Sequence, residues 1–548
     1  MEKWLEPLRE GPGDPKVLRV LADALLERGE TAWSEAIQLA LDLEHRFPGE
    51  DEWIDGHRKL RRLIDAHGAR WQTLVWGPAQ SHLHRPTFYR GVPTRLSAWG
   101  SNPQQWLNGP LGAVDVSPGL DLSKWDGLAL VTEFGATHEN VSFEKLRSVT
   151  HLAVRWDPGN IVKRLAAAPF LAQLESLRFS GPHGFEVSAA DLDALWSLKL
   201  PKLRTVTFEE LTLGASGAEV LAAKLPATVV DLSLVNASLG AKGAQAVAHA
   251  KWLPSLKALT LARDTLGDKA VTALAAAQLD GLVSLRLNQV VNAKTAPPLL
   301  ERKWPNLREL SLNGCPFKGK AAGALTELQA PKLTVLHLGG CALGDDGLAE
   351  VAKAKLPKLR QLNLNANSVK GPGMVALGKS KLLSTVEELW VSHNKFQNTG
   401  AKGLADSKHL GSLRELSLGH NWMGSRGLQG ILKAAPKLER VLEGMNNYGA
   451  QLERSFAAGE AKSLLVLAAG SDSTTDVLEK LADAKVTATL ELLSFMTRAF
   501  DDAIAERLVK GPVGSAKTQV VVYLAWCNAL TEKGKQALSA LGNRVSFA

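Results

Sequence analysis

One sequence pattern recurs at a nearly constant interval through the middle of this chain. Its five clearest copies begin at Leu307, Leu333, Leu359, Val386 and Leu413, so that successive starts lie 26, 26, 27 and 27 residues apart. A unit of this size cannot bury its own apolar face, and neighbouring units must therefore stack on one another. The repeat predicts a solenoid with one continuous core, which excludes most other architectures.

Each copy follows the arrangement L-x-x-L-x-L-x-x-N/C-x-L, as in the stretch LRQLNLNANSV that begins at Leu359. The alternation in L-x-L suits a short strand of a parallel sheet, and the helix-period segment that follows can cover the back of that strand. The pattern resembles the leucine-rich repeat. The resemblance implies an α/β fold, a right-handed leucine-rich-repeat solenoid with a parallel concave sheet and convex helices, preceded by a small all-α module.

The segment ALGDDGLAEVA, which begins at Ala342, is similar to the ribonuclease-inhibitor-like and cysteine-containing subclasses of this repeat. The Asn or Cys of the pattern should lie where the chain leaves the strand, and there a side-chain amide can pair with backbone groups. This structural turn ladder comprises Cys315, Cys341, Asn367, Asn394, Asn421 and Cys527. The three cysteines are expected to be buried and reduced, because they are not clustered as a disulfide framework or a zinc site requires.

Residues 1–68 are predicted to form a helical module. Asp14 and Pro15 supply an N-cap and a first-turn proline, and the third helix of the module is expected to end at Gly68. The stretches LRVLADALLERGE, EAIQLALDLE and HGARW resemble the repeat-companion domain that precedes leucine-rich repeats in some bacterial proteins. The resemblance implies an accessory module and supplies no mechanism.

Residues 69–124 are rich in Trp, Pro and Gly and follow no period, so we expect an irregular cap over the open end of the core. The alternative is a ligand pocket built from its tryptophans, Trp71, Trp76, Trp99 and Trp106. His82 and His84 have no Cys or carboxylate beside them, and no metal site is predicted. The solenoid is expected to occupy residues 125–548 in about 16 turns, starting with the strand DGLAL at Asp126 and ending in degenerate turns.

Composition restricts the setting and the partner. The net charge is +8, but residues 1–70 hold 11 Lys+Arg against 15 Asp+Glu, which leaves 53 against 41, or +12, for the remainder. A basic solenoid weakly favours an acidic partner. The charged N-terminal stretch and the absence of a long apolar run indicate no signal peptide and no membrane span, so we expect a cytoplasmic protein.

The outward positions of the concave sheet form the candidate partner-binding face. They are Arg263, Arg286, Asn288, His337, Asn363, Asn365, Trp390, Ser392, His393 and His420. Trp390, His393 and His420 come from adjacent turns and combine an aromatic ring with hydrogen-bonding groups, as interface anchors do. In the alternative interpretation Trp390 merely covers the sheet and the histidines are solvated.

Basic residues also recur at the entrance of each strand, namely Lys202, Lys332, Lys358, Lys437, Arg204, Arg308, Arg360 and Arg414. Glu309, Glu388 and Glu415 lie beside them, which favours a paired edge over a nucleic-acid interface. No phosphate-binding loop, nucleophile elbow or H-E-x-x-H motif occurs, so neither catalysis nor a cofactor is expected.

The sequence therefore predicts a non-catalytic scaffold that binds another protein on its concave face. The alternatives are a structural or regulatory subunit that binds through its ends and its N-terminal module, and a nucleic-acid binder. The identity of the partner and the oligomeric state stay open.

Overall fold

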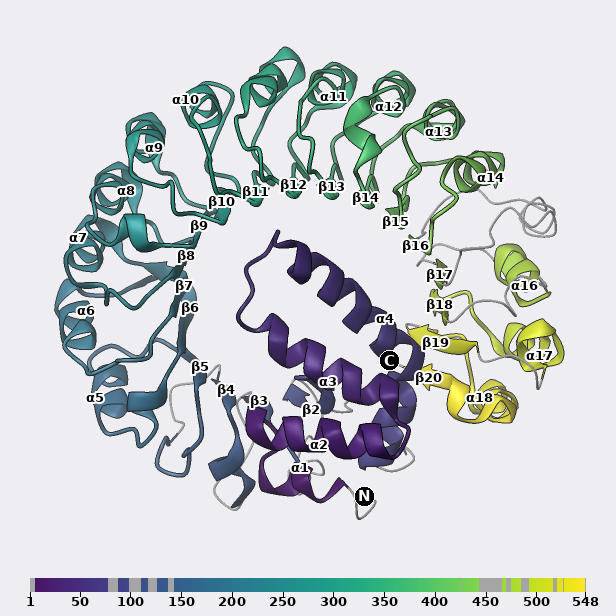
Figure 1. Cartoon of the computed structure of the whole chain (residues 1–548), viewed down its shortest axis with the longest axis horizontal. Helices are drawn as coiled ribbons and strands as arrows, with labels where there is room; N and C mark the ends of the chain where they lie inside the picture. Colours follow the sequence, from purple (N-terminus) through teal and green to yellow (C-terminus); the bar gives the residue numbers. More distant parts are fainter. Residues whose placement is uncertain are drawn as a thin grey trace. The chain divides into compact units, whose positions relative to one another are not determined.

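The computed structural model describes residues 5–76, 87–97, 110–116, 126–136, 142–423, 425–442, 466–469, 475–483, 492–515, 520–525 and 527–547. The backbone divides into two compact units. Unit 1 comprises Met1–Val290 with Trp304–Glu309, and unit 2 comprises Val291–Lys303 with Leu310–Ala548. The predicted α/β solenoid is confirmed, because parallel strands alternate with helices or helical turns in both units (Figure 1).

Unit 1 begins with helices and continues as a sheet. Its α-helices are α1 (Pro7–Glu10), α2 (Pro15–Glu27), α3 (Thr31–Leu43), α4 (Asp51–Trp76), α5 (Ile161–Ala166), α6 (Ala189–Trp196), α7 (Gly214–Lys224), α8 (Gly240–Ala248) and α9 (Gly267–Ala276). Its strands are β1 (Thr87–Tyr89), β2 (Val92–Ser97), β3 (Ala113–Val116), β4 (Glu133–Ala136), β5 (His151–Arg155), β6 (Ser176–Glu186), β7 (Thr205–Thr212), β8 (Asp231–Val235), β9 (Ala258–Ala262) and β10 (Ser284–Arg286). Short 3₁₀ turns η3 (Asp126–Leu130), η4 (Leu171–Gln173) and η5 (Leu253–Ser255) complete the set.

The sheet of unit 1 starts earlier than the sequence predicts. Strands β2 to β10 pair in parallel in chain order, so the expectation of an irregular cap is wrong for β2 and β3. The predicted first strand DGLAL is also wrong, because it forms η3. Backbone pairing decides the position of the true strand, β4: Thr132 N donates to Gly112 O, and Glu133 then lies between Ala113 and His151.

The N-terminal helices pack around a buried aromatic stack. Trp33 and Trp71 are fully buried, and their rings stack with centroids 5.3 Å apart. The predicted helix end at Gly68 is wrong, because α4 continues to Trp76. Gly68 has a packing role instead: an added Cβ would lie 3.0 Å from the ring of Phe88. Trp71 and Trp76 therefore belong to α4, whereas Trp99, Trp106, His82 and His84 lie outside the described residues.

A two-residue hairpin attaches this helical module to the sheet. Strands β1 and β2 are antiparallel, and their loop residues Arg90 and Gly91 have φ of 50° and 78°, the left-handed geometry that a tight hairpin requires. Gly91 O accepts from Trp33 Nε1 at 3.2 Å, and a Cβ on Gly91 would lie 2.6 Å from Ala36 O. Only glycine permits this approach.

Unit 2 continues the repeat. Its α-helices are α10 (Ala296–Leu300), α11 (Gly344–Val351), α12 (Gly371–Gly378), α13 (Gln397–Ala405), α14 (Ser425–Ala434), α16 (Thr475–Asp483), α17 (Asp502–Lys510) and α18 (Glu532–Leu538). Strand β11 (Glu309–Ser311) crosses the boundary in sequence, followed by β12 (Val335–His337), β13 (Gln361–Asn363), β14 (Glu388–Trp390), β15 (Glu415–Ser417), β16 (Arg440–Leu442), β17 (Val466–Ala469), β18 (Leu492–Met496), β19 (Val521–Ala525) and β20 (Val545–Phe547). The 3₁₀ turns are η6 (Gly319–Glu327), η7 (Lys381–Ser384), η9 (Pro512–Gly514) and η10 (Ser539–Arg544).

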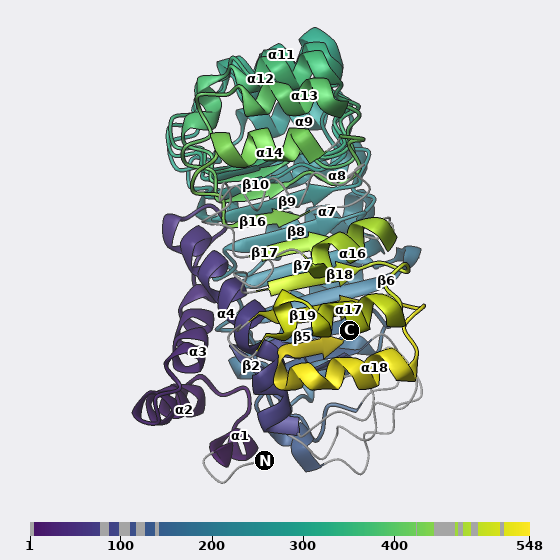
Figure 2. The ribbon, with the colours of Figure 1, turned by 90° about the vertical axis from the view of Figure 1, so that its right-hand side faces the viewer.

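The L-x-L leucines build the core of unit 2. Strands β12 to β20 pair in parallel and in chain order, which confirms the predicted closing edge at the C-terminus. The register places Leu336, Leu362, Leu389 and Leu416 side by side, all at most 1% exposed. Helices α16, α17 and α18 cover one face of β17, β18 and β19 (Figure 2). In each unit, we call the face of the sheet that lies opposite the helices the inner face.

Candidate functional site

The parallel register brings the predicted inner-face residues of unit 2 into one row. His337 lies beside Asn363, Asn363 beside Trp390, and Trp390 beside Ser417. All four side chains are partly exposed. The rings of His337 and Trp390 lie 6.2 Å apart between centroids. A 26- or 27-residue repeat thus converts distant sequence positions into neighbours across the strands.

A second feature follows at the turn after each strand. The imidazole rings of His393 and His420 stack with centroids 4.0 Å apart and an interplanar angle of 13°. Both residues have left-handed backbones, with φ of 56° and 59°. The equivalent residue one turn earlier, Ala366, has the same geometry, as do Gln289 and Arg263 in earlier turns, so the left-handed backbone is a feature of the repeat. What distinguishes these two turns is the stacking of their imidazole rings.

The turn ladder lies directly beneath these histidines. Asn394 Oδ1 accepts from Asn367 N at 3.0 Å, and Asn421 Oδ1 accepts in the same way from Asn394 N at 3.0 Å. The three asparagines are at most 2% exposed. The ladder fixes the backbone that carries the stacked histidine pair.

Cysteine takes the ladder position in other turns. Cys341 Sγ donates to Leu312 O at 3.1 Å, and burial raises the pKa of this thiol to about 12, with a smaller contribution from Cys315. Cys315 and Cys341 are fully buried. Cys527 is partly exposed, so the expectation of burial is wrong for it. All three are free thiols.

Two of the predicted partner-binding residues in unit 2 are used within the chain. Asn365 Oδ1 accepts from Ser392 N at 2.7 Å, which ties two turns together. Ser392 is only 7% exposed, and its hydroxyl lies 2.6 Å from that of Ser417. We therefore leave Asn365 and Ser392 out of the candidate surface.

The predicted arginines of unit 1 are engaged with carboxylates. Arg263 lies 3.1 Å from Glu210, and Arg286 Nε donates to Glu309 Oε1 at 2.9 Å. The backbone oxygen of Asn288 accepts from Arg263 N at 2.9 Å. These pairs neutralise the two arginines, so an acidic partner gains little from them.

A buried acidic group lies in the same part of unit 1. Burial raises the pKa of Asp231 to about 6, while Arg286 acts to lower it and Glu309 to raise it further. Glu309 is 2% exposed and accepts from Ser284 Oγ at 2.6 Å. The cluster is structural, since every one of its charges faces another group of the chain.

Three arginines of the basic strand-entry edge are also paired. Arg360 Nη2 donates to Glu387 Oε2 at 2.7 Å, and Arg414 pairs with Glu439. The carboxylates come from the following turn, and they are not the neighbouring glutamates that the sequence suggested. Arg308 lies 3.8 Å from Asp51 within unit 1. Paired arginines offer a weak field to nucleic-acid phosphates.

Sequence reasoning missed two residues beside the stacked histidine pair. Trp422 directly follows Asn421 and is 52% exposed, an unusual exposure for a large aromatic side chain. The ammonium of Lys395 lies 5.8 Å from the centroid of its ring. The sequence did contain a signal for Trp422: earlier copies of the repeat have Ser368 and Ala342 at this turn position.

The described residues contain no group of three His, Cys, Asp or Glu side chains that could hold a metal ion. No helix among them combines the length and apolarity that a membrane crossing requires.

Similarity to known proteins agrees with the repeat geometry. A family model described as Leucine Rich repeat matches residues 329–352, 383–405 and 409–432. Each matched segment spans one helix-bearing turn of unit 2, with the buried apolar pair of the strand and the ladder residue in place. The fold is a leucine-rich-repeat solenoid.

No curated protein sequence matches this chain. Among solved structures it is similar to the yeast Rad7 and Elc1 complex, at 17% identity over 69% of this chain and 85% of that chain, with a TM-score of 0.39. It is also similar to a leucine-rich repeat protein of Leptospira interrogans, at 16% identity over 82% of this chain and 99% of that chain, with a TM-score of 0.35.

Proposed function

We propose that this protein is a recognition scaffold that binds another protein through the inner face of unit 2. The recognition strip comprises Trp390, His393, His420 and Trp422, with His337 and Asn363 continuing it along the sheet. The observation that carries the proposal is the stacking of His393 on His420, since their two turns also carry Trp390 and the exposed Trp422.

The chemistry of the strip suits a protein surface. Trp and Tyr are the residues most enriched among interface hot spots, because they bury much apolar area at low entropic cost. The histidine rings add polar edges that can donate or accept hydrogen bonds. The strands and the asparagine ladder hold these groups in place before a partner arrives, which lowers the entropic cost of binding.

The test compares two triple variants in affinity capture from native cell extract. The first, Trp390→Ala, His393→Ala, His420→Ala, removes the centre of the strip. The control, Lys353→Ala, Lys381→Ala, Lys433→Ala, changes exposed residues of the helical layer. We expect a protein that the wild type and the control retain and the strip variant loses. That protein is then purified, and Trp390→Ala alone should weaken its binding by about 2 kcal/mol, roughly 30-fold.

A second candidate function rests on the N-terminal module. Val20 and Leu26 on α2 are 62% and 52% exposed, so the chain could serve as a subunit that docks through this helix. The variant Val20→Asp, Leu26→Asp goes into the same capture experiment. If it loses the partner while the strip variant keeps it, the proposal for the inner face is wrong and the module carries the interaction.

A further inference from the structure

A hollow opens on the helical side of unit 2, between α12 and α13. Its volume is about 340 Å³. The glycines Gly378 and Gly403 lie at the closest approach of the two helices, since a Cβ on Gly378 would lie 2.1 Å from Gly403 O. The two glycines therefore allow the helices to pack closely at the floor of the hollow.

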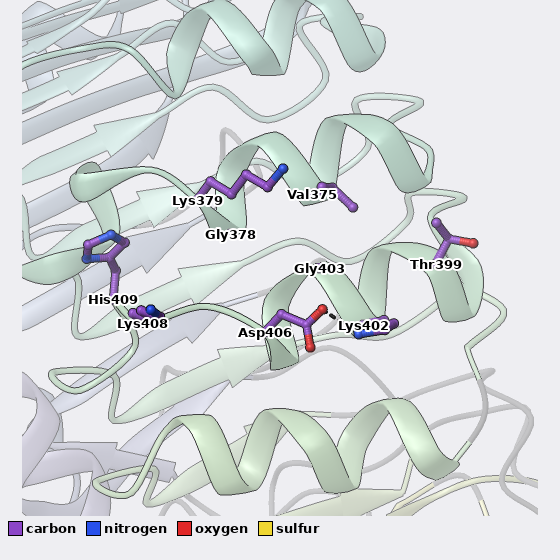
Figure 3. A pocket seen from close by; sticks show the side chains of 9 residues that line it. All are labelled: Val375, Gly378, Lys379, Thr399, Lys402, Gly403, Asp406, Lys408 and His409. Carbon is purple, nitrogen blue, oxygen red and sulfur yellow. Dashed lines mark hydrogen bonds and ion pairs between the residues drawn. The ribbon is translucent and has the colours of Figure 1, made fainter.

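Cationic side chains surround this hollow. Lys379 follows α12, Lys402 lies in the last turn of α13, and Lys408 and His409 follow α13 (Figure 3). Lys402 pairs with Asp406 at 2.5 Å. Within the described part of the chain, Lys379 and Lys408 make no ion pair. The lining thus carries three ammonium groups against one carboxylate, a net charge of +2 without counting His409.

The preceding turn acts as an internal reference for this arrangement. There Lys353, the counterpart of Lys379 at a spacing of 26 residues, pairs with Glu350 at 2.8 Å. The counterparts of Glu350 in α12 and α13 are Ala376 and Gly403. The carboxylate that neutralises Lys353 therefore has no counterpart in α12 or α13, and the hollow lies between these two helices.

We propose that this hollow binds a small molecule carrying a phosphate monoester, whose phosphate takes the place of the missing carboxylate. A phosphate monoester carries a charge of about −1.5 to −2 at neutral pH, which matches the net charge of the lining. Lysine is a common point-charge ligand for phosphate. The volume lies at the small end of the roughly 300–1,000 Å³ range of ligand sites, and the remaining floor of Val375, Gly378 and Gly403 suits a compact organic group.

His409 and Thr399 complete the polar lining. The ring of His409 is oriented through its Nδ1, which lies 3.1 Å from Ser384 Oγ. Thr399 contributes a hydroxyl from the first turn of α13.

The probe for the test is glycerol 3-phosphate, titrated into the full chain by calorimetry at low salt, with glycerol as the uncharged reference. We expect saturable binding of the phosphate and none of glycerol. Lys379→Gln, Lys408→Gln should weaken it about tenfold or more, because two charged contacts are lost. The matched control Lys353→Gln, Lys433→Gln removes the same net charge outside the hollow and should change the affinity less than about twofold.

A further variant changes the affinity in the opposite direction. Asp406→Asn removes the competing carboxylate and releases Lys402, so it should bind glycerol 3-phosphate several-fold more tightly. The proposal is overturned if wild type shows no saturable binding, if the control pair weakens binding as much as the hollow pair, or if Asp406→Asn binds more weakly. Thermal melts of all variants keep loss of binding distinct from loss of folding.

Discussion

Replacing Asn394 with alanine tests how far the turn ladder supports the protein. Asn394 Oδ1 accepts from two backbone N–H groups, those of Asn367 at 3.0 Å and Val369 at 3.1 Å. Its Nδ2 donates to Leu364 O at 3.0 Å and to Val391 O at 2.9 Å. The side chain is 2% exposed, so water cannot take over these bonds without opening the turn.

The magnitude follows from the groups left behind. Each buried backbone N–H that loses its acceptor costs about 1–3 kcal/mol. Val391 O keeps a second donor, Asn421 Nδ2 at 2.9 Å, so losing the bond from Asn394 costs less free energy there. The two N–H groups that lose their acceptor and the Leu364 carbonyl that loses its donor together predict a destabilisation of about 3–5 kcal/mol for Asn394→Ala.

The assay combines urea unfolding with hydrogen exchange. Solenoid turns can open separately, so the local exchange rates of the Asn367 and Val369 amides report the lesion directly. Asn365→Ala, which loses one bond from a half-buried side chain, should cost only about 1 kcal/mol. The stability of Asn394→Cys should fall between those of the two alanine variants, because Cys341 makes one hydrogen bond from the equivalent ladder position. The reasoning fails if Asn394→Ala is no less stable than Asn365→Ala, or if both amides keep their protection.

Two further predictions use the shifted pKa values. The pKa of Asp231 is raised above that of the unfolded chain, so its contribution to stability is present below about pH 4 and is lost as the pH rises through about 6. Asp231→Asn should remove this loss and be more stable at pH 7.5 by up to about 3 kcal/mol; an unchanged pH profile of urea midpoints would contradict it. Iodoacetamide at pH 8 should alkylate Cys527 first and reach Cys341 only in denaturant, because burial holds that thiol protonated; equal labelling rates by mass spectrometry would refute this.

The repeat alone was sufficient to predict the strands and the ladder of unit 2. An L-x-L pair every 26 or 27 residues leaves one arrangement in which all the leucines are buried, namely parallel strands in register. Trp390 and His393 were therefore placed beside their neighbours from sequence positions alone. Degenerate copies carried less information, and the strand expected at Asp126 proved to be a 3₁₀ turn.

Packing between segments could not be predicted in this way. Gly68 looks like a helix stop in sequence, but α4 continues through it. Its lack of a side chain makes room for the ring of Phe88, a contact that the local sequence does not show. The sequence places His393 and His420 in adjacent turns, but only the structure shows that their rings stack on one another.

The sequence by itself determined the solenoid, because periodic burial of leucine is encoded locally and repeated in every turn. Only the tertiary structure decided which polar side chains stay available. Arg263, Arg286 and Asn365 are engaged by groups of their own chain, whereas Lys379 and Lys408 surround a hollow. Whether a polar side chain is engaged depends on which residues of the neighbouring turn lie within hydrogen-bond distance of it. Helix and strand packing set those distances.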